Sequence, residues 1–252
     1  MLEAKLSDSQ VFKRIVEAIK DLVNEANFDC NPSGITLQAM DSTHVALATL
    51  LMRADEFESF RCDRNIPLGI NLSSLTKILK SANASDSITL RAKDSGDSLS
   101  LMFESPNRTC EYDLKLMALD TEHLGIPEQP YDAMIGMNSN EFQRIVRDLY
   151  SLSESVSSEH IKFEAKGEIG SGSISLKPRD TVDKDKEAVN LSVSKNAFTT
   201  LSLKFLSIIS KACPLSDRVI IGICEEQPVS IEFKIGQHGY LRYYLAPKVG
   251  EE

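Results

Sequence analysis

The chain has 252 residues, of which 42% are hydrophobic and 26% charged, as in a soluble protein with one large or two small domains. Its longest apolar stretches, Val45–Met52 and Val219–Cys224, are too short to span a membrane, and Met1–Phe12 lacks the apolar run of a signal peptide. The net charge of −9 excludes a protein that is basic throughout, but an acidic total can conceal a basic face.

The first half of the chain predicts two amphipathic helices among strands. In the helix that begins at Ser9, Phe12 and Ile15 fall on one side and the basic residues on the other. A second helix is expected over Leu72–Ala82. The segments that alternate or run apolar, and so predict strands, are Gly34–Met40, Val45–Met52, Ile88–Lys93, Leu99–Phe103 and Glu111–Leu116.

Residues 118–133 predict an extended connector, because two prolines and a glycine exclude a helix there. Leu124, Ile126 and Tyr131 make this segment unusually apolar for a linker. Two interpretations are open: the side chains pin the connector to the domains, or they form part of a docking groove. Composition alone favours the first.

The second half repeats the first. Ser139–Leu149 matches Ser9–Ile19, and the same offset superimposes 205–212 on 75–82, which indicates a duplication. Helices are expected over Ser139–Leu152 and about Leu201–Ala212. Strands are expected over Ile161–Ala165, Ser173–Lys177, Ala188–Val193, Val219–Cys224, Val229–Ile235 and Tyr240–Leu245. The sequence therefore predicts an α+β protein of two similar βαβββαβββ domains, 1–117 and 134–252, joined by the connector 118–133.

Each predicted helix carries basic residues opposite its apolar stripe. For any single helix an ordinary solvated face explains this pattern. No aromatic stacking set accompanies the bases, and no helix is rich in Asn, Gln and Arg, so a DNA ligand would be held by its phosphates without reading of sequence. The basic residues on these faces are Lys13, Arg14, Lys20, Lys77, Lys80, Arg144, Arg147, Lys204 and Lys211.

Motifs for catalysis and phosphate binding are missing from the sequence. The glycine-rich segment Gly167–Ser173 precedes strand alternation and reads as a turn. Asp41 and His44 with Cys62 would be a conceivable thiol site, but a lone cysteine and histidine are far more often structural. The five cysteines are widely spaced without a C-x-x-C pair, which favours a reducing compartment and argues against disulfides and zinc. We therefore predict no enzymatic activity, no cofactor and no metal.

Two stretches, Gly34–Phe57 and Arg61–Ala82, closely resemble the proliferating cell nuclear antigen family of eukaryotic DNA sliding clamps. The segments LGIPEQ (Leu124–Gln129) and LRYYLAPK (Leu241–Lys248) match as well, so the resemblance covers essentially the whole chain. It implies the DNA-clamp fold, in which three identical chains close head to tail with sheets outside and helices lining a hole for duplex DNA. The implied function is a nuclear processivity factor for replicative DNA polymerases and a docking platform for replication and repair proteins.

The resemblance also implies where neighbouring chains and clients bind. The edge strand Thr109–Leu114 of one subunit would pair with Gly172–Lys177 of the next, with Cys110, Tyr112, Leu114, Ser173, Ile174 and Ser175 at the subunit interface. The implied clients (DNA polymerase, clamp loader, flap endonuclease and DNA ligase) would insert a short helical turn into a docking site. Its residues are Met40, His44, Val45, Leu47, Leu124, Gly125, Ile126, Tyr131, Pro228, Tyr244, Ala246 and Pro247.

One departure from the family pattern concerns a lysine that usually precedes the first long strand of the second domain and carries ubiquitin or its relative. Here Ser155–His160 is expected to be a shortened loop and contains no lysine. Lys162 and Lys166 fall on the strand or beyond it, which puts that modification in doubt. The alternatives are a checkpoint-type clamp subunit of a heterotrimeric ring and a protein scaffold that does not bind DNA. The connector and the LAPK tail favour the replicative clamp, and a scaffold leaves the basic residues on all four helices unexplained.

Overall fold

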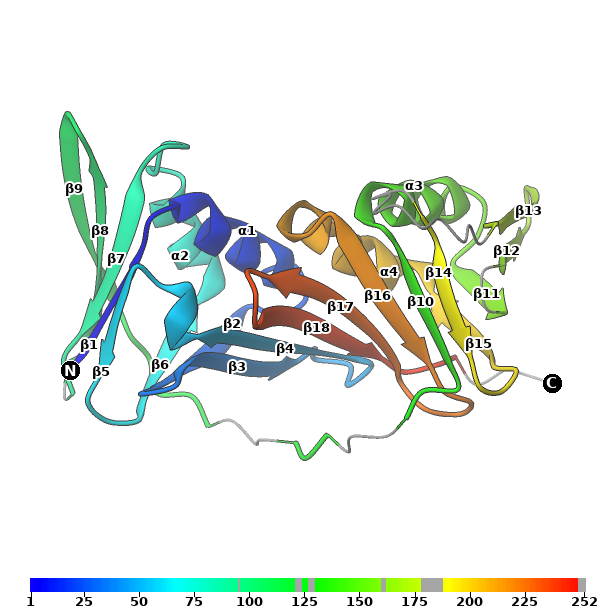
Figure 1. Ribbon diagram of the computed structural model, residues 1–252, viewed down its shortest axis with the longest axis horizontal. Helices are drawn as coiled ribbons and strands as arrows, with labels where there is room; N and C mark the ends of the chain where they lie inside the picture. The colour runs from blue at the N-terminus through cyan, green and yellow to red at the C-terminus, as the bar shows by residue number, and fades with distance from the viewer. Residues whose placement is uncertain (95, 121–123, 127–129, 160–161, 178–187, 249–252) are drawn as a thin grey trace. The chain divides into compact units, whose positions relative to one another are not determined.

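The computed structural model describes residues 1–94, 96–120, 124–126, 130–159, 162–177 and 188–248. The chain divides into two compact units, each with strands, two α-helices and a core (Figure 1). The first unit comprises Met1–Ser42, Ala48–Leu124 and Ile235–Leu241, and the second comprises Thr43–Leu47, Gly125–Lys234 and Arg242–Glu252. Within the described ranges, no helix is both long enough and apolar enough to cross a membrane.

The first half of the chain alternates strands with two α-helices. Its elements in order are β1 (Leu2–Leu6), α1 (Ser9–Ile19), β2 (Glu25–Asn31), β3 (Gly34–Met40), β4 (Ala46–Arg53), the 3-10 helix η1 (Ala54–Glu56), β5 (Ser59–Cys62), β6 (Ile66–Asn71), α2 (Leu72–Leu79), β7 (Ser87–Ala92), β8 (Ser98–Ser105) and β9 (Arg108–Lys115).

The second half repeats this order. Its elements are β10 (Ala133–Asn138), α3 (Ser139–Tyr150), β11 (Ser155–Glu159), β12 (Lys162–Gly167), β13 (Gly170–Ser175), β14 (Asn190–Val193), β15 (Phe198–Ser202), α4 (Leu203–Ile209), the 3-10 helix η2 (Ser210–Leu215), β16 (Arg218–Ile223), β17 (Val229–Ile235) and β18 (Gly239–Leu245).

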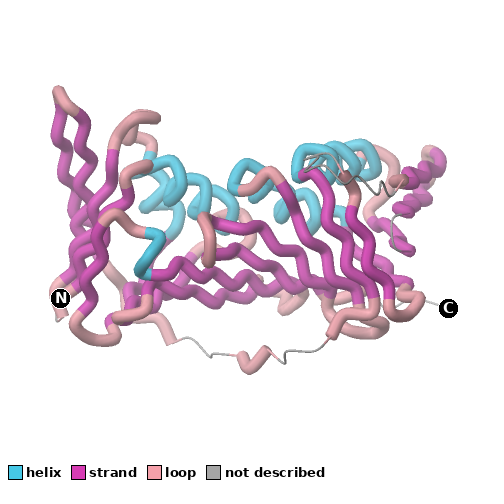
Figure 2. Tube along the Cα trace, viewed as in Figure 1, coloured by secondary structure: helices cyan, strands magenta, loops and turns pink. Residues whose placement is uncertain are grey.

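In the first unit, helices α1 and α2 lie on one side of antiparallel strands (Figure 2). One sheet has the order β5-β1-β7-β8-β9, and a second contains β3, β2 and β6 as neighbours. Phe12 and Ile15 of α1 are buried, and the Phe12 ring centre lies 6.1 Å from that of Phe28 on β2. The apolar stripe read from the sequence is thus the face on which α1 packs.

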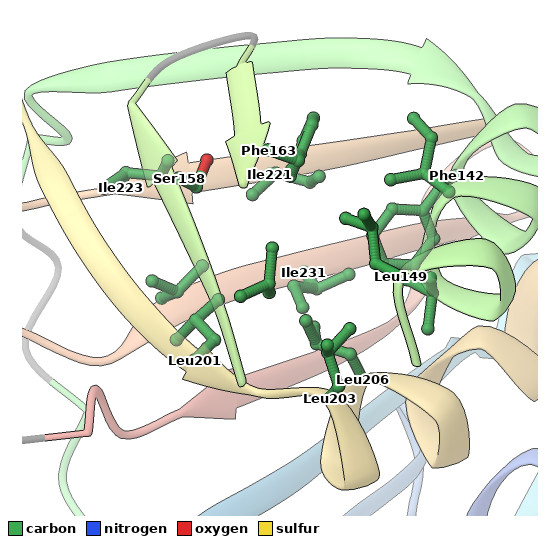
Figure 3. Close-up of a pocket in the computed structure, with 14 residues that line it drawn as sticks. Phe142, Leu149, Ser158, Phe163, Leu201, Leu203, Leu206, Ile221, Ile223 and Ile231 are labelled. Carbon is green, nitrogen blue, oxygen red and sulfur yellow. The ribbon is translucent and has the colours of Figure 1, made fainter. Parts of the chain in front are cut away.

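In the second unit, α3 and α4 likewise cover strands. The neighbours β14, β10, β16 and β17 form one group, and a four-stranded sheet has the order β13-β12-β11-β15. Between these layers lies a small, mostly apolar void of about 20 Å³. Figure 3 draws the residues that line it, which include Phe142, Leu149, Leu206 and Ile231. A void of this size holds at most about one water, and its mostly apolar lining offers a water few partners, so it is a packing defect in the core.

The helix boundaries follow from local chemistry. Asp8, Asn71 and Asn138 each cap a helix by accepting a hydrogen bond from a backbone N–H of its first turn, at 2.8–2.9 Å. Helix α4 ends at Ile209, earlier than predicted, and the chain tightens into η2. Pro214 explains this change, because proline lacks an N–H and its ring collides with the carbonyl four residues earlier in an α-helix.

The α+β class and the duplicated clamp fold are confirmed, but each half contains more strands than the predicted βαβββαβββ order. Between the helices the sequence did not predict β2, β5 and β6 in the first half, or β11 and β15 in the second. Ser155–His160, expected to be a loop, is strand β11 as far as Glu159, and residue 160 lies outside the described residues. Most of these segments are polar or mixed in composition and become strands through pairing with neighbours. β6, with the sequence IPLGIN, is apolar but contains proline and glycine, which weaken strand preference.

Candidate DNA-facing, edge-strand and docking sites

The basic residues of α1 and α2 lie opposite the buried stripes of their helices. Arg14, Lys77 and Lys80 are exposed, whereas Lys13 and Lys20 are half-buried. Lys20 and Lys80 are the C-terminal caps of their helices, one residue beyond the last helical position. Positive charge at a helix C-terminus is favourable towards the helix dipole, so these lysines stabilise their own helices whether or not they contact a ligand.

Helix α3 carries both signs of charge on its exposed side. Arg144 contacts Glu141 and Asp148 at 3.7 Å each, and Arg147 Nε lies 3.3 Å from an Asp148 oxygen. The two arginines are therefore balanced by two carboxylates. Helical spacing allows Glu141 and Asp148 to pair with Arg144, but the ion pairs depend on side-chain rotamers, so the predicted basic face did not include these acids. We conclude that α3 offers phosphates less positive potential than α2 does.

The Asp148 carboxylate provides a direct test of this balance. Asp148→Asn should free Arg147 and leave Arg144 paired with Glu141 alone, and so tighten the binding of duplex DNA, by about twofold to tenfold at low salt and less at high salt. Fluorescence anisotropy of a labelled duplex over a salt series measures the change. Asp97→Asn, on an exposed loop between strands, is the matched control. Equal affinity of the two variants would contradict the proposed role of this helix face.

Lys204 and Lys211 are both exposed, but they do not share one α-helix as predicted. Lys204 lies on α4, and Lys211 lies on η2, where each residue rotates by about 120° instead of 100°. The spacing of seven residues that placed them on one helical face therefore does not apply. Both remain candidates for contact with phosphates because each is exposed.

Strands β9 and β13 are the outermost strands of their sheets (Figure 1). In the described part of the chain, no strand pairs with the free side of either one. On β9, Leu114 is buried and Cys110 and Tyr112 are half-buried, while the residues between them are exposed. The Tyr112 ring centre lies 6.0 Å from that of Phe103, so this side chain already packs within its own unit.

Strand β13 is backed by the end of helix α3. On this strand Ile174 is half-buried, whereas Ser173 and Ser175 are exposed. A Cβ added at Gly172 would lie 2.7 Å from Leu152, so the absence of a side chain lets the strand approach the residue that follows α3. Both predicted interface strands thus have a free backbone edge beside apolar side chains.

The candidate docking residues of the first unit are Met40 and Leu124. Leu124 is 42% exposed, and its backbone forms two hydrogen bonds with the side-chain amide of Gln38. Gln38 precedes Met40 by two residues on β3, so both side chains leave the same face of the sheet. Gln38 was not among the predicted docking residues, because a contact between positions 86 residues apart leaves no local signal in the sequence.

In the second unit, two docking segments are joined by their backbones: Ala246 N–H donates to the Val45 carbonyl at 2.9 Å. His44 next to it is exposed and has a φ of 58°, a left-handed conformation that marks a tight turn. The hydroxyl of Tyr244 accepts a hydrogen bond from Arg242 at 3.0 Å. Of the other candidate residues, Leu47 is buried, Gly125 and Pro228 are exposed, and Ile126 and Pro247 are half-buried.

Tyr131, near the end of the connector, packs against Gly222 of β16. A Cβ added at Gly222 would lie 2.8 Å from two carbons of the Tyr131 ring, so only glycine leaves room for the ring there. The next residue, Asp132, accepts a hydrogen bond from Glu225 N–H at 3.0 Å, and that bond lowers the pKa of its carboxyl group. The connector is therefore pinned at this end.

The remaining titratable clusters have structural roles. Desolvation raises the pKa of the Cys62 thiol, which is the opposite of what a nucleophilic cysteine needs. Asp55, Glu56 and His238 lie close together, with 3.5 Å between Asp55 Oδ2 and His238 Nδ1. However, Glu56 Oε1 already accepts the backbone N–H groups of Gln237 and His238 at 2.8 and 2.7 Å, so it caps a turn.

Residues 1–123 match the family model described as proliferating cell nuclear antigen, N-terminal domain, and residues 125–248 match the model of its C-terminal domain. The chain is also 50% identical over 258 residues to the proliferating cell nuclear antigen of Chaetomium thermophilum, with 100% of each chain covered. The duplicated fold and these matches define a DNA sliding clamp, a processivity factor that is not an enzyme. The chain belongs to the proliferating cell nuclear antigen family. The full-length match does not favour a checkpoint-type clamp.

Proposed function

We propose that three copies of this chain close head to tail into a ring that encircles duplex DNA and tethers replicative DNA polymerases to it. The observation that carries the proposal is that β9 and β13 are each the last strand of a sheet. A strand edge exposes unpaired backbone groups, and a heterologous contact between these two edges, repeated around an axis, satisfies the groups of both strands. The subunit interface consists of Cys110, Tyr112 and Leu114 from one chain and Ser173, Ile174 and Ser175 from the next.

The exposed basic residues of the helices face the DNA in this ring. They contact phosphates without reading bases, because lysine and arginine on helix faces give affinity that is independent of sequence. The ring acts in the nucleus, during DNA replication and repair. The native mass tests the assembly: a mass of three identical chains supports it, and a monomer or an obligate mixture with other chains contradicts it.

Residues 118–133 connect the two clamp domains, 1–117 and 134–252, and contribute to the site where clients dock. DNA polymerase, the clamp loader, the flap endonuclease and DNA ligase bind there through short peptide motifs. A single helical turn in each motif supplies apolar and aromatic side chains for the docking residues. The exposed Leu124 side chain supports this role, since an apolar residue that lies outside a core is available for a partner.

Truncation of the connector side chains should abolish most client binding. Leu124→Ala together with Ile126→Ala is expected to weaken the binding free energy of a client peptide by about 2–4 kcal/mol, which is typical of removing interface hot spots. Isothermal titration calorimetry with a synthetic client peptide measures the loss. Met134→Ala with Val193→Ala is the matched control, because those residues are 41% and 42% exposed on strands β10 and β14. Unchanged affinity in the connector variant would rule out this docking site.

A further inference from the structure

Three residues on neighbouring strands form a row that contacts the connector. Gly69 on β6 pairs with Asn27 on β2, and the register that pairs Phe28 with Leu37 places Gln38 of β3 on the other side of Asn27. Each member of the row contacts the backbone of the connector or of the segment that leads into it. The chain after β9 therefore crosses the strands β6, β2 and β3 along a line of anchors.

The contacts change from backbone to side chain along this row. At Gly69 the backbone bonds directly to the backbone, because Met117 N–H donates to the Gly69 carbonyl at 2.9 Å. A Cβ at Gly69 would lie 2.0 Å from the Met117 carbonyl oxygen, so no other residue fits. At Asn27 a short amide donates to the Leu119 carbonyl at 3.1 Å. The chain thus lies directly on β6 and one short side chain away from β2.

At Gln38 a longer amide makes the contact. Its Nε2 donates to the Leu124 carbonyl at 2.9 Å, and Leu124 N–H donates to its Oε1 at 2.6 Å. A primary amide carries the donor and acceptor of a peptide unit, so Gln38 pairs with Leu124 as a neighbouring β-strand residue would. All three residues of the row, Gly69, Asn27 and Gln38, bind backbone atoms of the facing segment. None of these hydrogen bonds involves a side chain of the connector.

The Leu124 side chain is only partly buried. It is 42% exposed, and a Cβ added at the following Gly125 would meet no described atom within 4 Å. Two hydrogen bonds to Gln38 therefore hold the backbone while the side chain stays available. A partner that finds Leu124 already placed does not bear the entropy cost of ordering it.

We propose that Gln38 is a positioning residue for client docking, which fixes the backbone of Leu124 and presets its side chain for the client peptide. The inference rests on the docking function proposed above. In this proposal the row Gly69, Asn27 and Gln38 sets the distance at which the backbone of Met117, Leu119 and Leu124 lies from the strands. The row acts on any connector sequence, because it contacts backbone groups alone.

The test compares Gln38→Ala and Gln38→Glu with the wild type in the assembled clamp. Gln38→Ala removes both hydrogen bonds, and Gln38→Glu keeps an acceptor but turns a carboxylate oxygen towards the Leu124 carbonyl. Both variants should bind a fluorescent client peptide roughly tenfold more weakly. Amide hydrogen exchange at Leu124 should accelerate by a similar factor, while native mass and thermal midpoint stay unchanged. Gln10→Glu is the matched control, since that amide donates to the Asn83 carbonyl outside the connector.

Wild-type peptide affinity in Gln38→Ala would overturn the inference, and so would weaker binding without faster exchange at Leu124. Loss of the native mass would also count against it, because it would assign Gln38 a general structural role. The Leu124→Ala, Ile126→Ala double variant is measured in parallel. If that variant loses affinity for the peptide and Gln38→Ala does not, the docking site on the connector is supported and the positioning role of Gln38 is refuted. If neither loses the peptide, the docking site itself is wrong.

Discussion

Tyr112→Ala should convert the ring into folded monomers. The residue lies on β9, whose free side has no partner in the described part of the chain, and it is half-buried before any neighbour binds. Truncating a large aromatic residue at an interface costs about 2–4 kcal/mol, and the ring contains that interface three times. Analytical ultracentrifugation over a dilution series should show the mass of one chain where the wild type keeps three.

The contact between Tyr112 and Phe103 requires a control, because Tyr112→Ala also removes packing inside the first unit. Phe60→Ala removes an aromatic ring from β5, the opposite edge of the same sheet. The ring centre of Phe60 lies 4.9 Å from that of Phe57. That variant should lose stability without losing the trimer. Ile174→Ala on β13 should weaken the same interface from the other side. A Tyr112→Ala trimer that resists dilution would refute the assignment of β9.

Reversing the charge of helix α2 should prevent the clamp from working on DNA. Lys77 and Lys80 are exposed, and among the described residues no carboxylate forms an ion pair with either one. Lys77→Glu with Lys80→Glu changes the charge by two units at each site in every chain of the ring. The duplex should be repelled, and clamp loading and polymerase processivity should fall by at least about tenfold at low salt. Primer extension on a circular template measures the effect.

The same double variant should keep its fold, its native mass and its peptide affinity, because the apolar face of α2 is untouched. Leu75 and Leu79 remain buried on the opposite side of the helix. Lys93→Glu with Lys234→Glu makes the same charge change on exposed positions outside the helices, and it should leave synthesis nearly unchanged. Wild-type processivity of the α2 variant at low salt would mean that this helix does not face DNA.

Periodicity predicted the helices well because their burial pattern is a property of a short segment. Phe12 and Ile15 mark the inner face of α1, and the structure buries both. Strands such as β11, with the sequence SVSSE, gave no comparable signal. Its strand character comes from pairing with β12 and β15, which the sequence does not reveal locally.

The candidate sites likewise divide into features that a short segment of sequence reveals and features that depend on the folded structure. The basic residues could be selected from the sequence because charge and spacing are visible there. The balance of Arg144 and Arg147 by Asp148 depends on rotamers, and the placement of Lys211 on a 3-10 turn depends on Pro214. Gln38 was not predicted at all, since its role requires Leu124 to arrive from a distant part of the chain.

The free edges of β9 and β13 have a consequence for a newly made chain that has not met its partners. Exposed strand edges promote aggregation, and these two edges limit that risk in different ways. Strand β9 carries charges of both signs on exposed residues, among them Arg108, Glu111 and Asp113, which penalise pairing with an unrelated apolar strand. Strand β13 reads GSGSIS, with weak intrinsic strand preference and one apolar side chain. Neither strand therefore favours pairing with an identical strand of another chain. An unassembled chain can remain dispersed until it meets a chain that offers the complementary edge.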